Sequence, residues 1–467
     1  MSGSFNEIDV PPTLCSFAVD VAKISDVVTT EFKAADHTLV KFPVKVDEFG
    51  LPDYDSLMAN YSKITELAKG KVIEAAYAVG FGGITEAVSK MAFGNRVGVE
   101  LCANQPKENW FKAEYGAIIA EVSKDNVAKL EECGVEYSVI GQTIEEEAFV
   151  CGDVKITIEE ALKAWTGTLE KVFPTKSDVE QKEIKTSLYD TKDIYVAKNK
   201  IARPKVFIPV FPGTNCEYDL TKSFAAAGAD VETVVFKNMS ASDIKESVSA
   251  YEKAIKASNI LMIPGGFSAG DEPDGSAKFI ASVFRNDYLK EAVHDLLKQR
   301  DGLVLGICNG FQALVKLGLV PYGEITDTKE DDPTLTMNSI GRHISQAVYT
   351  KVITNKSPWL QKAALGGVYS VPASHGEGRF VANEEWLKKL FANGQVATQY
   401  VDINGNPTMD ESFNPNGSYM AIEGITSPDG RVLGKMAHSE RRGNGVALNI
   451  TGEQNQLIFE SGVEYFK

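Results

Sequence analysis

The sequence predicts an α/β protein: a doubly wound, mostly parallel sheet over residues 204–467, preceded by an α+β unit over residues 1–160. In the larger unit, short apolar runs alternate with helical patterns, as they do when crossover helices join parallel strands. Several runs end in glycine-containing turns, and such turns at the carboxyl ends of parallel strands are where these sheets bind ligands. Residues 161–203 contain helical and charged stretches and are expected to connect the two units.

The larger unit begins with the apolar run KVFIPVF at residues 205–211, which is typical of a buried strand. Beyond it, the periodicity predicts helices over residues 219–227, 242–257 and 286–299, and strands over residues 231–236, 260–263 and 303–307. The acidic stretch DTKEDD at residues 327–332 is expected to be a solvated loop rather than a metal site, because runs of charge usually face water.

The smaller unit has a mixed pattern with no regular alternation. Its apolar runs predict strands over residues 14–22, 97–101 and 114–122, and its helical patterns cover residues 54–68, 84–92 and 126–133. An α+β domain follows from this mixture.

The segment LVLGICNGFQALVKLG, residues 303–318, predicts a nucleophile elbow, in which a strand, a tight turn and a helix present one side chain. Gly306 and Gly310 flank Cys308 and let the chain reverse while the cysteine stays accessible. The positive end of the following helix favours thiolate over thiol. A buried cysteine that merely closes a turn is the simpler interpretation, but the glycine pair argues against it. Cys216 also precedes a predicted helix and lacks that pair, so we predict that it is not the nucleophile.

A cysteine nucleophile needs a base, and two of the five histidines begin a His-x-Glu pair. These are His375 with Glu377, in a glycine-flanked loop, and His438 with Glu440, after the strand-like residues 432–437. In an extended segment, residues i and i+2 point to the same side, so either glutamate could orient its histidine toward the cysteine. Spacing alone does not choose between the pairs.

Five stretches together carry a resemblance to a known family. The chain resembles class I (triad) glutamine amidotransferase domains, which have a flavodoxin-like sheet, and is particularly similar to the glutaminase of the phosphoribosylformylglycinamidine synthase family. Asparagine after the nucleophile is typical of that branch, and the usual His-Pro-Glu is His-Ser-Glu here. The stretches are GICNGFQ at 306–312, HSER at 438–441, FPGTNCE at 211–217, PGGFSAGD at 264–271 and SHGEGR at 374–379.

The resemblance implies a catalytic triad of Cys308, His438 and Glu440. In such enzymes the cysteine attacks the side-chain amide of glutamine, ammonia and a glutamyl thioester form, and water then releases glutamate. The tetrahedral intermediate needs preorganised donors for its oxyanion, which the backbone N–H after the nucleophile and one in the PGGF loop would supply. The expected oxyanion and substrate-binding residues are Gly266, Phe267, Asn309 and Gln312.

Residues 76–101 resemble the C-terminal half-domain of the aminoimidazole ribonucleotide synthetase-like fold found in the same large enzyme, although the glycine loop at 80–83 lacks the aspartate common in relatives. Residues 1–160 are therefore expected to be a synthetase subdomain and the chain a C-terminal fragment, since Met1 to Ser4 looks like the middle of a synthetase motif. The chain has no Gly-x-x-x-x-Gly-Lys-Ser/Thr loop and no upstream ATP-binding half. The complete enzyme would use ATP and Mg²⁺ in an N-terminal synthetase portion to convert formylglycinamide ribonucleotide to formylglycinamidine ribonucleotide. No cofactor is expected in this chain.

Composition excludes several other classes. A net charge of −16 argues against a nucleic-acid partner, because binding phosphates requires a basic face. The six cysteines form no C-x-x-C pair, so neither a metal site nor a disulfide framework is expected. No signal segment or membrane span is evident, and a cytoplasmic location is expected. Two alternatives are a different cysteine hydrolase of the same fold, which usually has histidine where Asn309 stands, and a non-catalytic regulatory module.

Overall fold

The computed structural model describes residues 3–5, 8–103, 106–177, 179, 183–185, 187–268, 276–443 and 445–467. The chain divides into two compact units, Met1–Phe173 and Pro174–Lys467. Residues 174–203 of the expected connecting segment belong to the larger unit. Tyr189 pairs with Thr354 in a β-bridge, and the N–H of Ile201 donates to the carbonyl of Phe466. The end of the PGGFSAGD stretch, Ala269 to Asp271, and the first residues Met1 and Ser2 lie outside the described residues.

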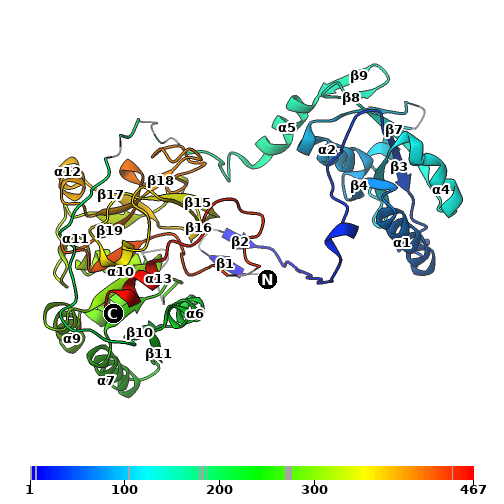
Figure 1. Ribbon diagram of the computed structural model, residues 1–467. Coiled ribbons are helices and arrows are strands. Elements are labelled where there is room, and N and C mark those ends of the chain that lie inside the picture. Colours follow the sequence, from blue (N-terminus) through cyan, green and yellow to red (C-terminus); the bar gives the residue numbers. More distant parts are fainter. Residues whose placement is uncertain are drawn as a thin grey trace. The chain divides into compact units, whose positions relative to one another are not determined.

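A nine-stranded sheet forms the centre of the larger unit (Figure 1). The predicted doubly wound parallel sheet is present as five strands, and four further strands extend it in antiparallel pairing. Their spatial order is β11 (Asp230–Val235), β10 (Lys205–Val210), β12 (Ile260–Ile263), β13 (Leu303–Ile307), β20 (Val432–Lys435), β19 (Ile422–Thr426), β18 (Val396–Val401), β15 (Ile344–Val352) and β16 (Val368–His375).

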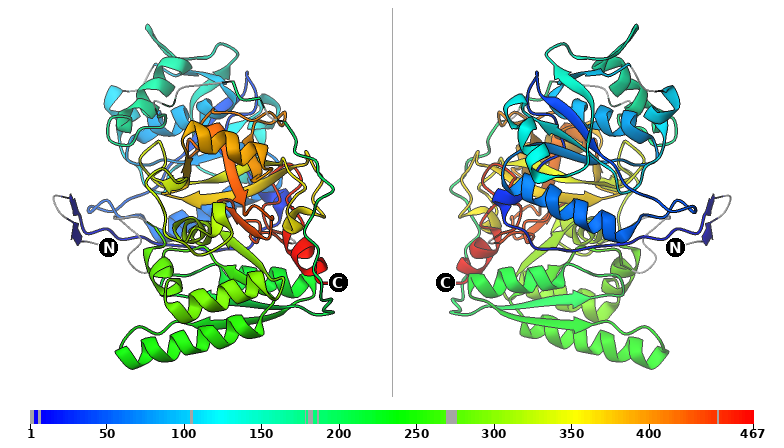
Figure 2. Two further views of the ribbon diagram at one scale, coloured as in Figure 1. Left: turned by 90° about the vertical axis from the view of Figure 1, so that its left-hand side faces the viewer. Right: turned by 90° about the vertical axis from the view of Figure 1, so that its right-hand side faces the viewer.

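Helices cover both faces of the parallel part of this sheet. Figure 1 shows α7 and α9 on one side of β10 and β11 and α6 on the other, and Figure 2 shows the same layers from the side. Three of these helices begin after a side chain that accepts a backbone hydrogen bond: Ser240 before α7, Asn286 before α9 and Asn383 before α12. The helices of this unit are α6 (Glu217–Ala227), α7 (Ala241–Ala257), α8 (Lys278–Phe284), α9 (Asp287–Lys298), α10 (Asn309–Lys316), α11 (Leu319–Tyr322), α12 (Glu384–Ala392) and α13 (Ile458–Glu464).

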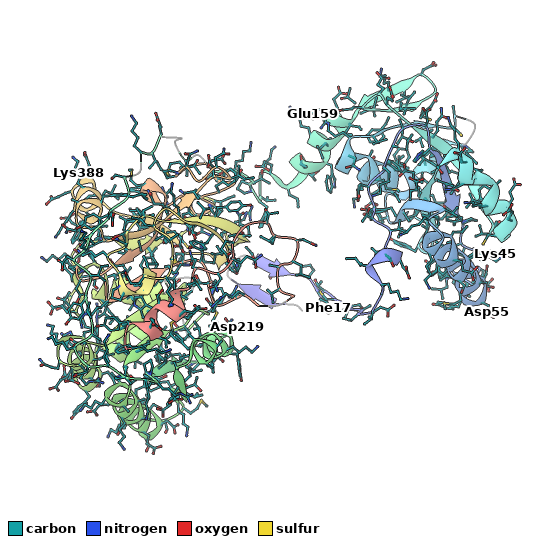
Figure 3. The ribbon with its side chains drawn as sticks, viewed as in Figure 1. Phe17, Lys45, Asp55, Glu159, Asp219 and Lys388 are labelled. Carbon is teal, nitrogen blue, oxygen red and sulfur yellow. The ribbon has the colours of Figure 1, made fainter. Side chains whose placement is uncertain are left out.

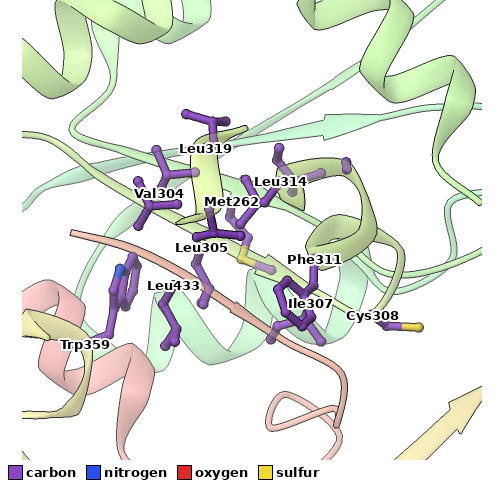
Figure 4. Close-up of a cluster of buried hydrophobic side chains, with 14 of the residues drawn as sticks. Met262, Val304, Leu305, Ile307, Cys308, Phe311, Leu314, Leu319, Trp359 and Leu433 are labelled. Carbon is purple, nitrogen blue, oxygen red and sulfur yellow. The ribbon is translucent and has the colours of Figure 1, made fainter. Parts of the chain in front are cut away.

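The core of the larger unit surrounds β13, whose five residues are all buried (Figure 4). Close packing between β20 and α10 depends on Gly434, because an added Cβ there would lie 2.1 Å from the ring of Phe311. β13 therefore lies between two parallel neighbours, β12 and β20, and beneath a tightly packed helix.

The smaller unit has a seven-stranded sheet with two separate buried clusters, one containing side chains of α1 and the other side chains of α2. In spatial order its strands are β4 (Ile73–Ala78), β6 (Ile118–Val122), β3 (Thr38–Phe42), β7 (Ser138–Ile144), β5 (Gly98–Leu101), β8 (Ala148–Cys151) and β9 (Val154–Thr157). Its helices are α1 (Tyr54–Lys69), α2 (Gly83–Asn95), α3 (Lys107–Phe111), α4 (Val127–Cys133) and α5 (Ile158–Thr166).

The strand predicted over residues 14–22 is wrong. This stretch forms no strand, and its apolar side chains, including Leu14, are almost fully exposed. Phe17 is labelled in Figure 3. An alternating apolar pattern becomes a strand only when a neighbour pairs with it, and no described strand does so here. Two separate two-stranded antiparallel sheets are also present: β1 (Gly3–Phe5) pairs with β2 (Ile8–Val10), and β14 (Thr334–Thr336) pairs with β17 (Arg379–Val381), which lies far along the sequence. None of the helices that the structure describes has both the length and the apolar content needed to cross a bilayer.

Candidate active site

Cys308 lies in the turn between β13 and α10 with φ 53° and ψ −108°, a conformation that residues other than glycine rarely adopt. Such backbone strain costs about 1–3 kcal/mol and occurs mainly at functional sites. Close packing requires both flanking glycines. A Cβ added at Gly306 would lie 2.7 Å from the carbonyl of Gly310, and a Cβ added at Gly310 would lie 2.0 Å from the carbonyl oxygen of Ile263. Figure 4 shows the Cys308 side chain pointing away from the hydrophobic cluster. The predicted elbow is therefore present.

His438 and Glu440 are in direct contact. The Nδ1 of His438 lies 2.5 Å from Oε1 of Glu440, and both side chains are buried. The opposite ring nitrogen, Nε2, is also buried and has no hydrogen-bond partner among the described residues. A Cβ at Gly265 would lie 2.8 Å from Cε1 of His438 and 3.4 Å from Cβ of Cys308, so the histidine and the cysteine border the same glycine. This arrangement matches the order thiol, imidazole and carboxylate that a triad requires.

Among the described residues, His375 and Glu377 form no hydrogen bond with each other. His375 faces Asn338, with Nδ1 3.2 Å from Oδ1, while Glu377 accepts hydrogen bonds from the N–H and hydroxyl of Ser276, both at 2.9 Å. The flanking glycines do not leave this segment loose, since both side chains are buried and the N–H of Gly378 also donates to Asn338. This segment is part of the interior of the unit.

The two histidines also differ in the direction in which their pKa values are shifted. Burial opposes the charge of His438, but attraction to Glu440 and Cys308 prevails and raises the pKa of His438 well above its usual value. Burial likewise opposes the charge of Glu440, yet the neighbouring imidazole holds the pKa of this carboxyl below its usual value. The two groups form an imidazolium–carboxylate pair. Burial, with repulsion from His438 and His343, lowers the pKa of His375 to about 3, so this ring is neutral.

The predicted oxyanion and substrate residues surround the elbow. The N–H of Phe267 donates to the carbonyl of Gly213 at 2.9 Å, which favours Gly266, whose φ is 130°, as the donor from that loop. Asn309 is the first residue of α10, and its side-chain amide donates to Oε1 of Gln312 at 3.1 Å. Gln312 in turn donates to the carbonyl of Glu377 at 2.5 Å, so its amide is bonded on both sides within the protein.

Cys216 lies beside the histidine, which the sequence analysis missed. It caps α6, is buried, and places its Sγ 3.9 Å from Nδ1 of His438. The guanidinium of Arg441 donates to the same sulfur at 3.4 Å. FPGTNCE follows β10, and the strands that come next in the sequence, β11 and β12, lie on opposite sides of β10. Loops at the carboxyl ends of strands at such a switch point meet at one site, so this position could have indicated that Cys216 lies near the active site.

A family model described as a CobB/CobQ-like glutamine amidotransferase domain matches residues 203–466, more than half of the chain. The chain belongs to this glutamine amidotransferase family. The amidotransferase is 34% identical over 284 residues to the phosphoribosylformylglycinamidine synthase subunit PurQ of Methanococcus maripaludis, which covers 56% of this chain and 97% of the relative. It is 35% identical over 237 residues to the PurQ subunit of Sulfurimonas denitrificans, covering 51% and 90%. A solved structure of PurLQS from Thermotoga maritima is 25% identical, covers 57% of this chain and all of that one, and has a TM-score of 0.41.

In this amidotransferase, three buried side chains are close enough to share a metal ion. One ligand atom each from Cys216, His438 and Glu440 lies within 4.8 Å of the others. Over the part of the chain that the structure describes, no other group of three or more histidine, cysteine, aspartate or glutamate side chains is this close. The sequence spacing predicted no metal site because Cys216 lies on a different loop from His438 and Glu440.

Proposed function

We propose that this chain is the glutaminase of a phosphoribosylformylglycinamidine synthase, with Cys308 as nucleophile, His438 as general base and acid, and Glu440 as the orienting carboxylate. The observation that supports it most is the buried contact of His438 with Glu440 beside the strained elbow. The identity of 34% to PurQ, over nearly the whole length of that subunit, supports the choice of synthase.

The reaction follows from the charges of the site. The Cys308 thiolate attacks the side-chain carbonyl carbon of glutamine, and the carbonyl electrons move to oxygen, where the N–H groups of Asn309 and Gly266 would stabilise them. The His438 imidazolium gives its proton to the leaving nitrogen, so that ammonia departs and a thioester remains. The neutral imidazole then takes a proton from water, whose hydroxide attacks the thioester and releases glutamate and the thiolate. The raised pKa of His438 suits the acid step.

The ammonia would serve an ATP-dependent synthetase. That partner would activate the amide oxygen of formylglycinamide ribonucleotide with ATP and Mg²⁺, and ammonia would displace it to give formylglycinamidine ribonucleotide. Residues 1–160 would be a synthetase-type subdomain, residues 161–203 its connection and residues 204–467 the glutaminase. Glutamine would be the substrate of this chain, whose own residues supply the chemistry without a cofactor.

Glutamate release from glutamine, together with covalent labelling by a diazo-ketone analogue of glutamine, tests this function. We expect one label per chain, mapped by peptide mass to Cys308, and no labelling or hydrolysis in Cys308→Ala. Cys216→Ala should still be labelled at Cys308, and Cys15→Ser, at an exposed position in the other unit, is the matched control. A stoichiometric label on another cysteine would contradict the assignment. Hydrolysis of peptides without hydrolysis of glutamine would instead favour a different cysteine hydrolase.

A further inference from the structure

We propose that Cys216, His438 and Glu440 form a binding site for zinc or a similar divalent ion, and that the bound ion inhibits the enzyme. The binding claim rests on geometry alone, whereas the inhibition rests on the proposed role of His438. The three side chains come from two loops: Cys216 precedes α6, and the other two follow β20. Neither loop contains a metal-binding motif.

The distances suit a small ion. Zinc bonds of about 2.0–2.3 Å in a tetrahedral site place neighbouring ligand atoms about 3.5 Å apart. The Sγ of Cys216 and Nδ1 of His438 are 3.9 Å apart, so a shift of a few tenths of an ångström brings both into range. Oε1 of Glu440 is too close to Nδ1 for both to bind, at 2.5 Å. Oε2 of the same carboxylate is buried, has no hydrogen-bond partner among the described residues, and would be the third ligand.

The chemistry of the three groups also suits zinc. A thiolate, an imidazole and a carboxylate are each common zinc ligands, and three protein ligands leave a fourth position for water. All three residues are at most 2% exposed, so water competes weakly for the ion. The Arg441 guanidinium, 3.4 Å from the sulfur, would repel a cation but favour the thiolate that forms when zinc displaces the thiol proton. Once zinc has displaced that proton and the proton on Nδ1 of His438, the two negative charges of thiolate and carboxylate outweigh the single positive charge of Arg441.

An ion at Nδ1 would disable the base. It replaces the proton that His438 shares with Glu440 and occupies the lone pair of that nitrogen. The other nitrogen then keeps its proton, so the ring has no lone pair with which to accept one from water. Thioester hydrolysis would stop although Cys308 is untouched.

Zinc binding to the purified chain, after removal of metals with a chelator, tests the site independently of activity. We expect one zinc per chain by equilibrium dialysis in the unaltered protein and in Cys308→Ala. Binding should be weaker by about tenfold or more in Cys216→Ser, which loses a ligand. Cys133→Ser, at a half-buried position in the other unit, is the matched control. Equal affinity in Cys216→Ser, or loss of the zinc in Cys308→Ala, would overturn the proposal, the second outcome placing the ion between Cys308 and His438.

A second measurement covers the case in which Cys216→Ser does not fold. X-ray absorption of zinc-loaded Cys308→Ala should show one sulfur neighbour at about 2.3 Å among nitrogen and oxygen ligands; its absence overturns the site. In the unaltered chain, zinc should inhibit glutamate release reversibly, and the half-inhibiting concentration should rise about tenfold or more in Cys216→Ser relative to that variant's own zinc-free rate. If the chain hydrolyses no glutamine at all, the proposed function fails, while the dialysis and absorption results still decide the site.

Discussion

The buried, neutral His375 should make the larger unit sensitive to acid. Its folded pKa is about 3, against an ordinary value of 6.5, because burial and the neighbouring charge of His438 disfavour protonation. Between these values the unfolded chain binds a proton that the folded chain does not. Stability from this residue is therefore complete above pH 6.5 and is lost progressively as the pH falls toward 3.

The size of this loss of stability follows from the two pKa values. Lowering the pKa from 6.5 to about 3 corresponds to about 5 kcal/mol over the whole interval, at roughly 1.4 kcal/mol per pH unit. Between pH 7 and pH 5 the histidine should account for a loss of about 2 kcal/mol in the free energy of unfolding. This is a large fraction of the stability of an ordinary domain.

Urea unfolding of His375→Asn measures this directly, because asparagine cannot titrate and its amide can still donate toward Asn338. The signal would be the fluorescence of Trp359 and Trp386, which both belong to the larger unit, in a background where Trp110 and Trp165 of the other unit are changed to phenylalanine. Between pH 7 and pH 5 the unaltered protein should lose about 2 kcal/mol more than the variant. His37→Asn, in the other unit, should behave as the unaltered protein does. If the curves for His375→Asn and its parent fall in parallel, the reasoning is refuted.

Three further outcomes are expected. His438→Ala should lower the rate of glutamate release by several orders of magnitude, whereas His375→Asn should keep measurable activity; the reverse result would exchange their roles. Gly310→Ala should destabilise the larger unit by about 3 kcal/mol or more in thermal unfolding, because its Cβ would lie 2.0 Å from a carbonyl oxygen, while Gly167→Ala, in open space, should have little effect. With formylglycinamide ribonucleotide, ATP and ammonia, the chain alone should form no ADP or amidine. Adding an N-terminal synthetase portion should restore glutamine-dependent synthesis. Formation of ADP by the chain alone would disprove the proposal that the ATP-dependent step belongs to a separate synthetase portion.

The sequence predicted those features that depend on neighbours along the chain. The elbow at Cys308 follows from glycines two residues to either side, and the strand at residues 303–307 from a continuous apolar run. Burial of His375 and the position of Cys216 could not be read in this way. Cys216 and His438 are 222 residues apart, and only the order of strands in the sheet brings their loops together. The strand predicted over residues 14–22 was wrong for the same reason: the apolar pattern is present, but no described strand pairs with it.

The position of β13 inside the sheet has a consequence for the timescale on which the site can move. β12 and β20 pair with β13 on its two sides, and the N–H of Cys308 itself donates to Lys435 of β20. Amides held in this way exchange with solvent deuterium only when the whole sheet opens. The backbone at Cys308, the proposed nucleophile, is therefore fixed by the sheet, and we expect substrate entry or activation by a partner to be accommodated by the surrounding loops.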